Sequence, residues 1–111
     1  MKMIGAVIKP EQLPAVKQAL FDAEIRHMTA APVMGTAPRT EQQMFRGVKK
    51  EVSLFNRVRL ELAVNDAVVE RAIEAISGGC MATGGAGKIF VSGLDDAVTV
   101  WTGERGSRAL Y

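Results

Sequence analysis

The order of the apolar patterns along the chain constrains its fold more than any other feature. Residues 1–8 form an almost wholly apolar run whose one charge is Lys2, which is typical of a buried strand. Pro10 ends this run and opens a helix, in which apolar residues recur at spacings of three and four: Leu13, Val16, Leu20 and Ala23. A second strand is predicted over about residues 28–34.

The same order of elements recurs in the second half of the chain. Residues 57–64 alternate as a strand does, with one apolar face made of Val58, Leu60, Leu62 and Val64. Asn65 is a suitable N-cap for a helix whose apolar residues have helical spacing: Val68, Val69, Ala72, Ile73 and Ile76. Two strands, residues 89–91 and 97–101, complete the pattern.

These two strand–helix–strand units predict an α+β fold of the ferredoxin-like βαββαβ type. Its sheet is mainly antiparallel and carries both helices on one face. A long loop separates strands 2 and 3, and residues 97–101 form a short extra C-terminal strand. A chain of 111 residues is long enough for one domain, residues 1–111, and too short for two.

Composition excludes several classes of protein. The chain is 48% hydrophobic and 23% charged, as ordinary soluble globular proteins are. It has no apolar run of roughly 20 residues that could span a bilayer, and its start is charged too soon for a signal peptide, so a cytoplasmic location is predicted. The lone Cys80 agrees with this location, because it cannot form an internal disulfide. A net charge of +2 and few aromatic residues predict no nucleic-acid partner.

The long loop, residues 35–54, has no sustained period and is rich in charge. A loop of about 20 residues in so small a domain is either functional or a misassigned element. Basic residues cluster in and after it: Arg39, Arg46, Lys49, Lys50, Arg57 and Arg59. The cluster is either a solvated face or a surface that meets acidic ligands or partners.

A glycine-rich loop precedes the strand at residues 89–91. Five of the eleven glycines lie between Gly78 and Gly87, and Lys88 follows at the end of the loop. Glycines let backbone N–H groups turn inward, and the lysine adds a positive charge, so the loop suits a bound phosphate. A flexible surface loop is about as good an interpretation.

Known nucleotide motifs and catalytic sets do not fit. A Walker A motif fails at Ala82 and Ile89, and a dinucleotide fingerprint fails because the glycines follow a helix and precede a strand. His27 and Cys80, the obvious soft metal ligands, lie far apart in the sequence. We therefore expect a structural or incidental role for each of them, no metal site and no catalytic residues. Trp101 is interpreted as a packing residue, with a subunit interface as one place for it, rather than as a platform for a ligand base.

Several segments in order resemble the PII signal-transduction family. They are MKMIGAVIKPEQLPAVKQAL, the pair Arg46-Gly47, RVRLELAV, VVERAIEAI, GKIFV and TGERG. The resemblance covers essentially the whole chain in one register, with about one residue missing from the long loop. It implies a homotrimer with a ferredoxin-like core, adenine nucleotides bound in clefts between subunits, and, in many members, 2-oxoglutarate with Mg²⁺. It also implies a T-loop at about 35–54, a B-loop at about 78–88 and a C-loop at about 102–111.

The resemblance carries over to individual positions. Six residues match the family's nucleotide site: Thr29, Gly35, Glu61, Gly85, Gly87 and Lys88. Arg57 matches the position that holds the 2-oxoglutarate carboxylate, and with Arg59 it gives a small-anion site. Four basic residues of the T-loop would contact a partner: Arg39, Arg46, Lys49 and Lys50.

Other positions depart from the family pattern. Ala86 replaces the Asp of GDGK, Met81-Ala82 replaces a Thr-Gly pair, and Cys80, Thr99 and Trp101 stand where the family has arginines. Each lost arginine removes a charge-assisted phosphate contact worth about 1.5–3 kcal/mol, so ADP or AMP is favoured over ATP. Substitutes for these arginines could come from Arg39, Arg105 and Arg108.

The T-loop departs from the family as well. The Mg²⁺-coordinating glutamine falls at Pro38, the uridylylated tyrosine at Lys50, and the phosphorylated serine near Val48. Phe45 replaces a further tyrosine. We therefore expect no uridylylation and no 2-oxoglutarate response of the usual kind.

The resemblance implies a regulator rather than an enzyme. It would sense an adenine nucleotide, a small anion such as bicarbonate, or both, at subunit interfaces. Its T-loop would control a membrane transporter or metabolic enzyme of nitrogen or inorganic-carbon metabolism. The alternative is a trimeric interaction module that has lost nucleotide sensing. A small acyl-phosphate hydrolase is disfavoured, because the glycine-rich loop lacks the arginine and asparagine such an enzyme needs.

Overall fold

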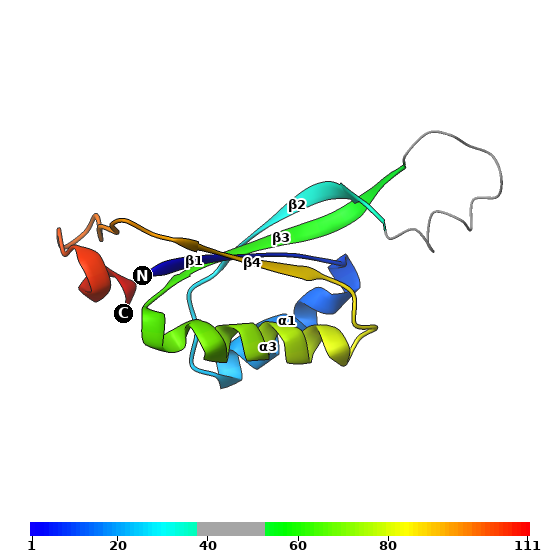
Figure 1. The fold of residues 1–111 in the computed structure, drawn as a ribbon, viewed down its shortest axis with the longest axis horizontal. Coiled ribbons are helices and arrows are strands. Elements are labelled where there is room, and N and C mark those ends of the chain that lie inside the picture. The colour runs from blue at the N-terminus through cyan, green and yellow to red at the C-terminus, as the bar shows by residue number, and fades with distance from the viewer. Residues whose placement is uncertain (38–52) are drawn as a thin grey trace.

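The structure, a computed structural model of the chain, describes residues 1–37 and 53–111. Its four strands pair in the order β2-β3-β1-β4, and every neighbouring pair is antiparallel. Both helices lie on one face of this sheet (Figure 1). The elements are β1 (Lys2–Ile8), α1 (Leu13–Asp22), β2 (Thr29–Thr36), β3 (Leu54–Val64), α3 (Val69–Met81) and β4 (Lys88–Gly93). The ferredoxin-like α+β fold predicted from the sequence is confirmed.

The hydrophobic core lies between the sheet and the two helices. The strands contribute Ile4, Ala6 and Ile8 from β1 and Leu60, Leu62 and Val64 from β3, and the helices contribute Val16, Leu20, Ala72 and Ile76. Full burial of each large aliphatic side chain stabilises the fold by about 1.5–3 kcal/mol. The apolar faces predicted from periodicity for residues 57–64 and for both helices are therefore the faces that pack, except that Ile73 lies outside the core cluster.

The β2–β3 hairpin extends beyond the rest of the sheet as an arm (Figure 1). Gly35 pairs with Phe55 and Thr36 with Leu54, so the long loop is shorter at both ends than predicted. The antiparallel register continues through these pairs, which satisfies their backbone hydrogen bonds. The predicted partner contacts lie outside the described residues: Arg39, Arg46, Lys49 and Lys50.

Helix α3 also differs from the prediction at both ends. It continues through Gly78 and Gly79 to Met81, whereas the sequence placed these glycines in a loop. A Cβ at Gly79 would lie 2.7 Å from the Val16 Cα, so this glycine lets α1 and α3 approach closely. At the other end Asn65 precedes a short 3₁₀ turn, Asp66–Val68, and its side chain does not cap the helix. That amide donates to the Ser107 carbonyl instead, at 3.2 Å.

The predicted C-terminal strand is wrong. In the described part of the chain, residues 97–101 make only an isolated bridge, Val98 to Arg105. The chain turns back before it can pair with the sheet, because the Thr99 N–H donates to the Glu104 carbonyl at 2.9 Å and the Gly103 N–H to the Thr99 carbonyl at 2.7 Å. Trp101 is 93% exposed, so this chain alone does not provide the packing predicted for it.

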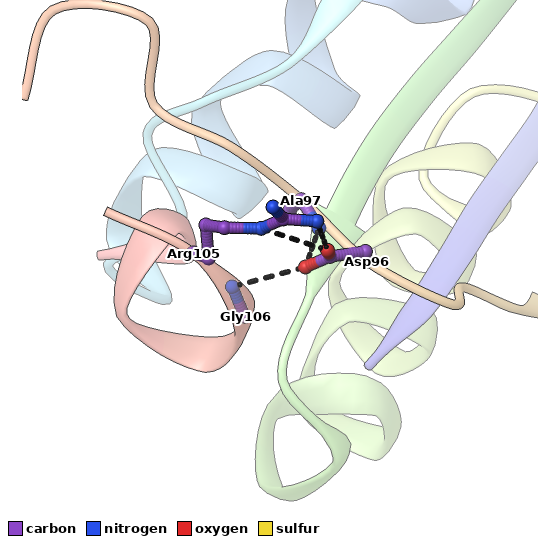
Figure 2. A network of polar contacts seen from close by, with 4 residues as sticks. All are labelled: Asp96, Ala97, Arg105 and Gly106. Carbon is purple, nitrogen blue, oxygen red and sulfur yellow. Dashed lines mark hydrogen bonds and ion pairs between the residues drawn. The ribbon is translucent and has the colours of Figure 1, made fainter. Parts of the chain in front are cut away.

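The turn is held by the Asp96 carboxylate (Figure 2). Arg105 forms an ion pair with Asp96 and donates from Nε to its Oδ2 at 3.0 Å. The other oxygen, Oδ1, accepts from the N–H groups of Ala97 and Gly106 at 2.8 and 3.2 Å. These bonds, that from Arg105 above all, hold the pKa of Asp96 below its usual value. Arg105 is thus engaged within its own segment, which argues against the phosphate-binding role considered for it.

Among the described residues, the structure contains no helix that is both long and apolar enough to cross a membrane. The cytoplasmic location stays a prediction.

Candidate functional site

The glycine loop, residues 82–87, connects α3 to β4 by a path that needs its glycines. The Cys80 carbonyl at the end of the helix accepts from the N–H groups of Thr83 and Gly85, at 3.0 and 2.7 Å. Gly84, Gly85 and Gly87 have φ angles of +105°, +76° and +141°. Other residues rarely adopt this left-handed region, so the sequence of the loop dictates its shape.

Gln12 holds this loop through hydrogen bonds to its backbone carbonyls, a role that was not predicted from the sequence. Its side chain is fully buried, with 0% exposure. The amide nitrogen donates to the carbonyls of Ala86 and Thr83 at 2.8 and 3.5 Å, and the amide oxygen accepts from the Lys9 N–H at 2.8 Å. A signal was present, because Gln12 stands four residues before Val16 and so continues the buried stripe of the first helix. A polar residue on such a stripe requires buried hydrogen-bond partners.

A cavity of about 110 Å³ lies beside the loop. Three of the predicted nucleotide-site residues line it: Gly85, Gly87 and Lys88. Cys80 lines it too, but its thiol is largely buried and burial raises its pKa. A neutral thiol there cannot replace the positive charge of the arginine that the family pattern expects at this position.

A larger cavity, of about 560 Å³, contains Thr29 and Glu61. These residues are paired across β2 and β3, and the Thr29 hydroxyl lies 3.4 Å from the Glu61 carbonyl that accepts its hydrogen bond. His27, Thr99 and Tyr111 also line the cavity, so the C-terminal segment closes one side of it. The Thr99 hydroxyl donates to the Ala109 carbonyl at 3.3 Å and so helps to hold that segment.

The strand register places the predicted site residues in successive rows on the helix-free face of the sheet. Leu60 and Leu62 face the helices, so Arg57, Arg59 and Glu61 face the other way. The first row is Thr29, Glu61, Gly5 and Phe90, and the second is Ala31, Arg59, Val7 and Lys88. Farther along the arm, Arg57 pairs with Val33 and Gly35 with Phe55.

The two arginines of the predicted small-anion site have partners in the protein. Arg59 forms an ion pair with Glu61, with 3.5 Å between Nη2 and Oε2, and both side chains are about half exposed. Arg57 donates from Nη1 to the Asn56 carbonyl at 2.8 Å, and its guanidinium lies 5.6 Å from the centre of the Phe55 ring. The structure therefore brings Arg59 next to Glu61, a predicted nucleotide-site residue, and places Arg57 farther out, on the β2–β3 arm.

The six predicted nucleotide-site residues do not meet at one point in a single chain. Thr29 and Gly35 stand six residues apart on β2, which at about 3.3 Å per residue separates them by roughly 20 Å. Lys88 lies on β4, the edge strand opposite to β2. Within the described ranges, no three His, Cys, Asp or Glu side chains are grouped so that they could hold a metal ion.

Comparison with known proteins identifies relatives along the whole chain. The family model described as nitrogen regulatory protein P-II matches residues 1–104. A nitrogen regulatory protein P-II from Rhodospirillum rubrum is 40% identical over 113 residues, covering 99% of this chain and 100% of the relative. Nitrogen regulatory protein GlnK1 from Methanosarcina mazei is 35% identical over 114 residues, covering 99% and 97%. Nitrogen regulatory protein P-II 2 from Methanothermobacter thermautotrophicus is 38% identical, with 99% and 97% covered.

Proposed function

Because the chain belongs to the nitrogen regulatory protein P-II family, whose members are trimeric signal-transduction regulators and not enzymes, we propose that it senses a ligand at its subunit interfaces. The ligand is an adenine nucleotide, a small anionic metabolite, or both. Occupancy is transmitted to a partner protein of nitrogen or inorganic-carbon metabolism. The partner is a membrane transporter or a metabolic enzyme.

The observation that carries this proposal is the placement of the site residues on the helix-free face. They occupy rows on one face but span roughly 20 Å along β2 alone. Thr29 and Lys88 also lie on opposite edge strands of the sheet, β2 and β4. If two copies share the site, the glycine loop of one and the Thr29 cavity of the other can each supply one half. The helix-free face is available for such a contact, because both helices cover the opposite face (Figure 1).

The glycine loop with Lys88 forms the phosphate half of this site. Lys88 supplies a point charge, and backbone N–H groups supply the remaining donors. The absence of arginines at Cys80, Thr99 and Trp101 lowers the affinity for the most highly charged ligand most, so ADP or AMP binds in preference to ATP. Arg57 and Arg59 take the small anion.

The single domain, residues 1–111, then has three functional loops. The T-loop, at about residues 35–54, docks on the partner through Arg39, Arg46, Lys49 and Lys50. The B-loop is the glycine loop, with the last turn of α3 leading into it. The C-loop, from Thr102 onward, includes Arg105 and Gly106, which donate hydrogen bonds to Asp96.

Isothermal titration with ATP, ADP, AMP, bicarbonate and 2-oxoglutarate tests the proposal. We expect ADP or AMP to bind more tightly than ATP, and Lys88→Gln to weaken nucleotide binding about tenfold because it removes a charge-assisted contact. Lys17→Gln, an exposed lysine on the outer side of α1, is the matched control. If the wild-type protein binds none of these nucleotides or anions, the proposal is refuted in favour of an interaction module that has lost ligand sensing.

A further inference from the structure

We propose that Gln12 is a positioning residue, which orients the backbone N–H groups of Gly84 and Gly87 toward a bound anion. The inference comes from the contacts of the Gln12 side chain. It rests on the proposed function only in taking the glycine loop to be a ligand loop. That Gln12 holds the loop in place is a separate claim, which can be tested without any ligand.

Both polar atoms of the Gln12 side-chain amide, the oxygen and the nitrogen, are hydrogen-bonded. Its oxygen accepts from the Lys9 N–H at 2.8 Å, and the Gln12 N–H donates back to the Lys9 carbonyl at 3.0 Å. This reciprocal pair closes the short 3₁₀ turn Pro10–Gln12, which fixes the side chain where β1 leads into α1. The amide nitrogen is thereby directed at the loop, where it reaches the carbonyls of Ala86 and Thr83. The side chain is fully buried, so water does not compete for these bonds.

Turning those two carbonyls inward determines the direction of the neighbouring N–H groups. In a trans peptide the carbonyl of one residue and the N–H of the next point in opposite directions. No peptide bond in the described residues is cis. With the Thr83 and Ala86 carbonyls facing Gln12, the N–H groups of Gly84 and Gly87 face the outer side of the loop. Two outward N–H groups followed by Lys88 form a set of donors suited to a phosphate oxygen.

Cys80 reports independently on the position of the loop. The residue is only 7% exposed, and the position that a Cβ would occupy on Gly87 is 3.5 Å from its sulfur. The loop thus packs against the thiol and helps to cover it. If Gln12 holds the loop closed, loss of its hydrogen bonds raises the rate at which an alkylating reagent reaches Cys80.

The experiment compares two substitutions of Gln12 with a matched control. Gln12→Met keeps the length of the side chain and removes both hydrogen-bonding groups, and Gln12→Glu keeps the shape but, when ionised, cannot donate to Ala86. Gln18→Leu removes an amide from an exposed position of α1, where it donates to the Asp22 carboxylate. Circular dichroism establishes that each variant is folded. Alkylation of Cys80 by iodoacetamide and titration with ADP and with inorganic phosphate are then measured on the full chain.

We expect Cys80 to be alkylated about tenfold faster in both Gln12 variants, and both to bind ADP about tenfold more weakly, because one or two hydrogen bonds are lost. Gln18→Leu should change neither the alkylation rate nor the ADP affinity. An unchanged alkylation rate in the folded variants overturns the positioning role. Faster alkylation with unchanged ADP affinity overturns the role in orienting the donors. If the wild-type protein binds neither ADP nor phosphate, the glycine loop is not a phosphate-binding loop, and the alkylation rates still decide whether Gln12 holds it in place.

Discussion

The contact between α1 and α3 at Gly79 gives a prediction that the structure makes sharp. A Cβ at this position would lie 2.7, 2.8 and 2.9 Å from the Cα, Cγ2 and N of Val16. Two of these three atoms belong to the backbone, so a change of rotamer cannot relieve the overlap. Gly79→Ala therefore requires the two helices to move apart.

The neighbouring glycine provides the control. Gly78 lies in the same helix, but a Cβ there meets nothing within 4 Å. Alanine in a helix is more favourable than glycine by about 0.5–1 kcal/mol, so Gly78→Ala should stabilise the protein by that amount. Gly79→Ala gains the same helix propensity but introduces overpacking that costs about 1–3 kcal/mol or more. Its net effect is a loss of about 0.5–2 kcal/mol, with the opposite sign to its neighbour.

Urea denaturation of both variants, followed by circular dichroism at one fixed protein concentration, measures these free energies of unfolding. A fixed concentration is needed because association of subunits adds to apparent stability. The two variants should differ by about 1–3 kcal/mol, which is large enough to resolve. Equal stability of Gly78→Ala and Gly79→Ala would show that the helices do not approach as closely as described.

Three further predictions concern other parts of the chain. The pKa of Asp96 is lowered in the folded state, chiefly by its hydrogen bond to Arg105, so its stabilising effect is present above the ordinary carboxyl value and is lost as pH falls below about 4. The protection of the amides at residues 97–106, measured relative to their intrinsic exchange rates, should fall there. Asp96→Asn, but not Asp95→Asn, should remove this pH dependence. Burial raises the pKa of the Cys80 thiol, so at pH 8 iodoacetamide should react with Cys80 in the native protein more slowly than with free cysteine. In urea, which exposes the thiol, the two rates should be equal. A native Cys80 that reacts as fast as free cysteine would contradict its burial. Trp101 is 93% exposed in one chain, and a neighbouring subunit is the packing partner predicted for it. Its fluorescence should therefore shift to the blue as the protein assembles. An unchanged spectrum would rule out that packing role.

Periodicity predicted the parts of the fold that depend on burial alone. The alternation over residues 57–64 identifies Leu60 and Leu62 as core residues, because a strand covered on one face has no other stable pattern. The same reasoning is wrong for residues 97–101, which alternate in the same way but turn back on themselves. A strand needs a partner as well as a pattern, and a single sequence does not contain that information.

The end of α3 and the role of Gln12 could not be predicted, because both depend on a tertiary contact. Two successive glycines argue against a helix, yet Gly79 is helical because α1 packs against it through Val16. Gln12 looks like an ordinary polar residue near a helix start until the glycine loop, more than seventy residues later, is seen against it. The resemblance to a known family predicted which residues of the glycine loop contact a ligand, but it did not identify the hydrogen bonds by which Gln12 holds that loop.

The ion pair between Arg59 and Glu61 has a consequence for any anion that binds on the helix-free face. The anion must compete for Arg59 with the Glu61 carboxylate, which lies on the same strand with its Oε2 3.5 Å from the Arg59 Nη2. Half-exposed pairs of this kind are worth at most about 1 kcal/mol, which corresponds to roughly a fivefold loss of affinity for the incoming anion. This internal competitor shifts the response toward ligands that are abundant, and Glu61→Gln should lower the concentration at which the anion binds.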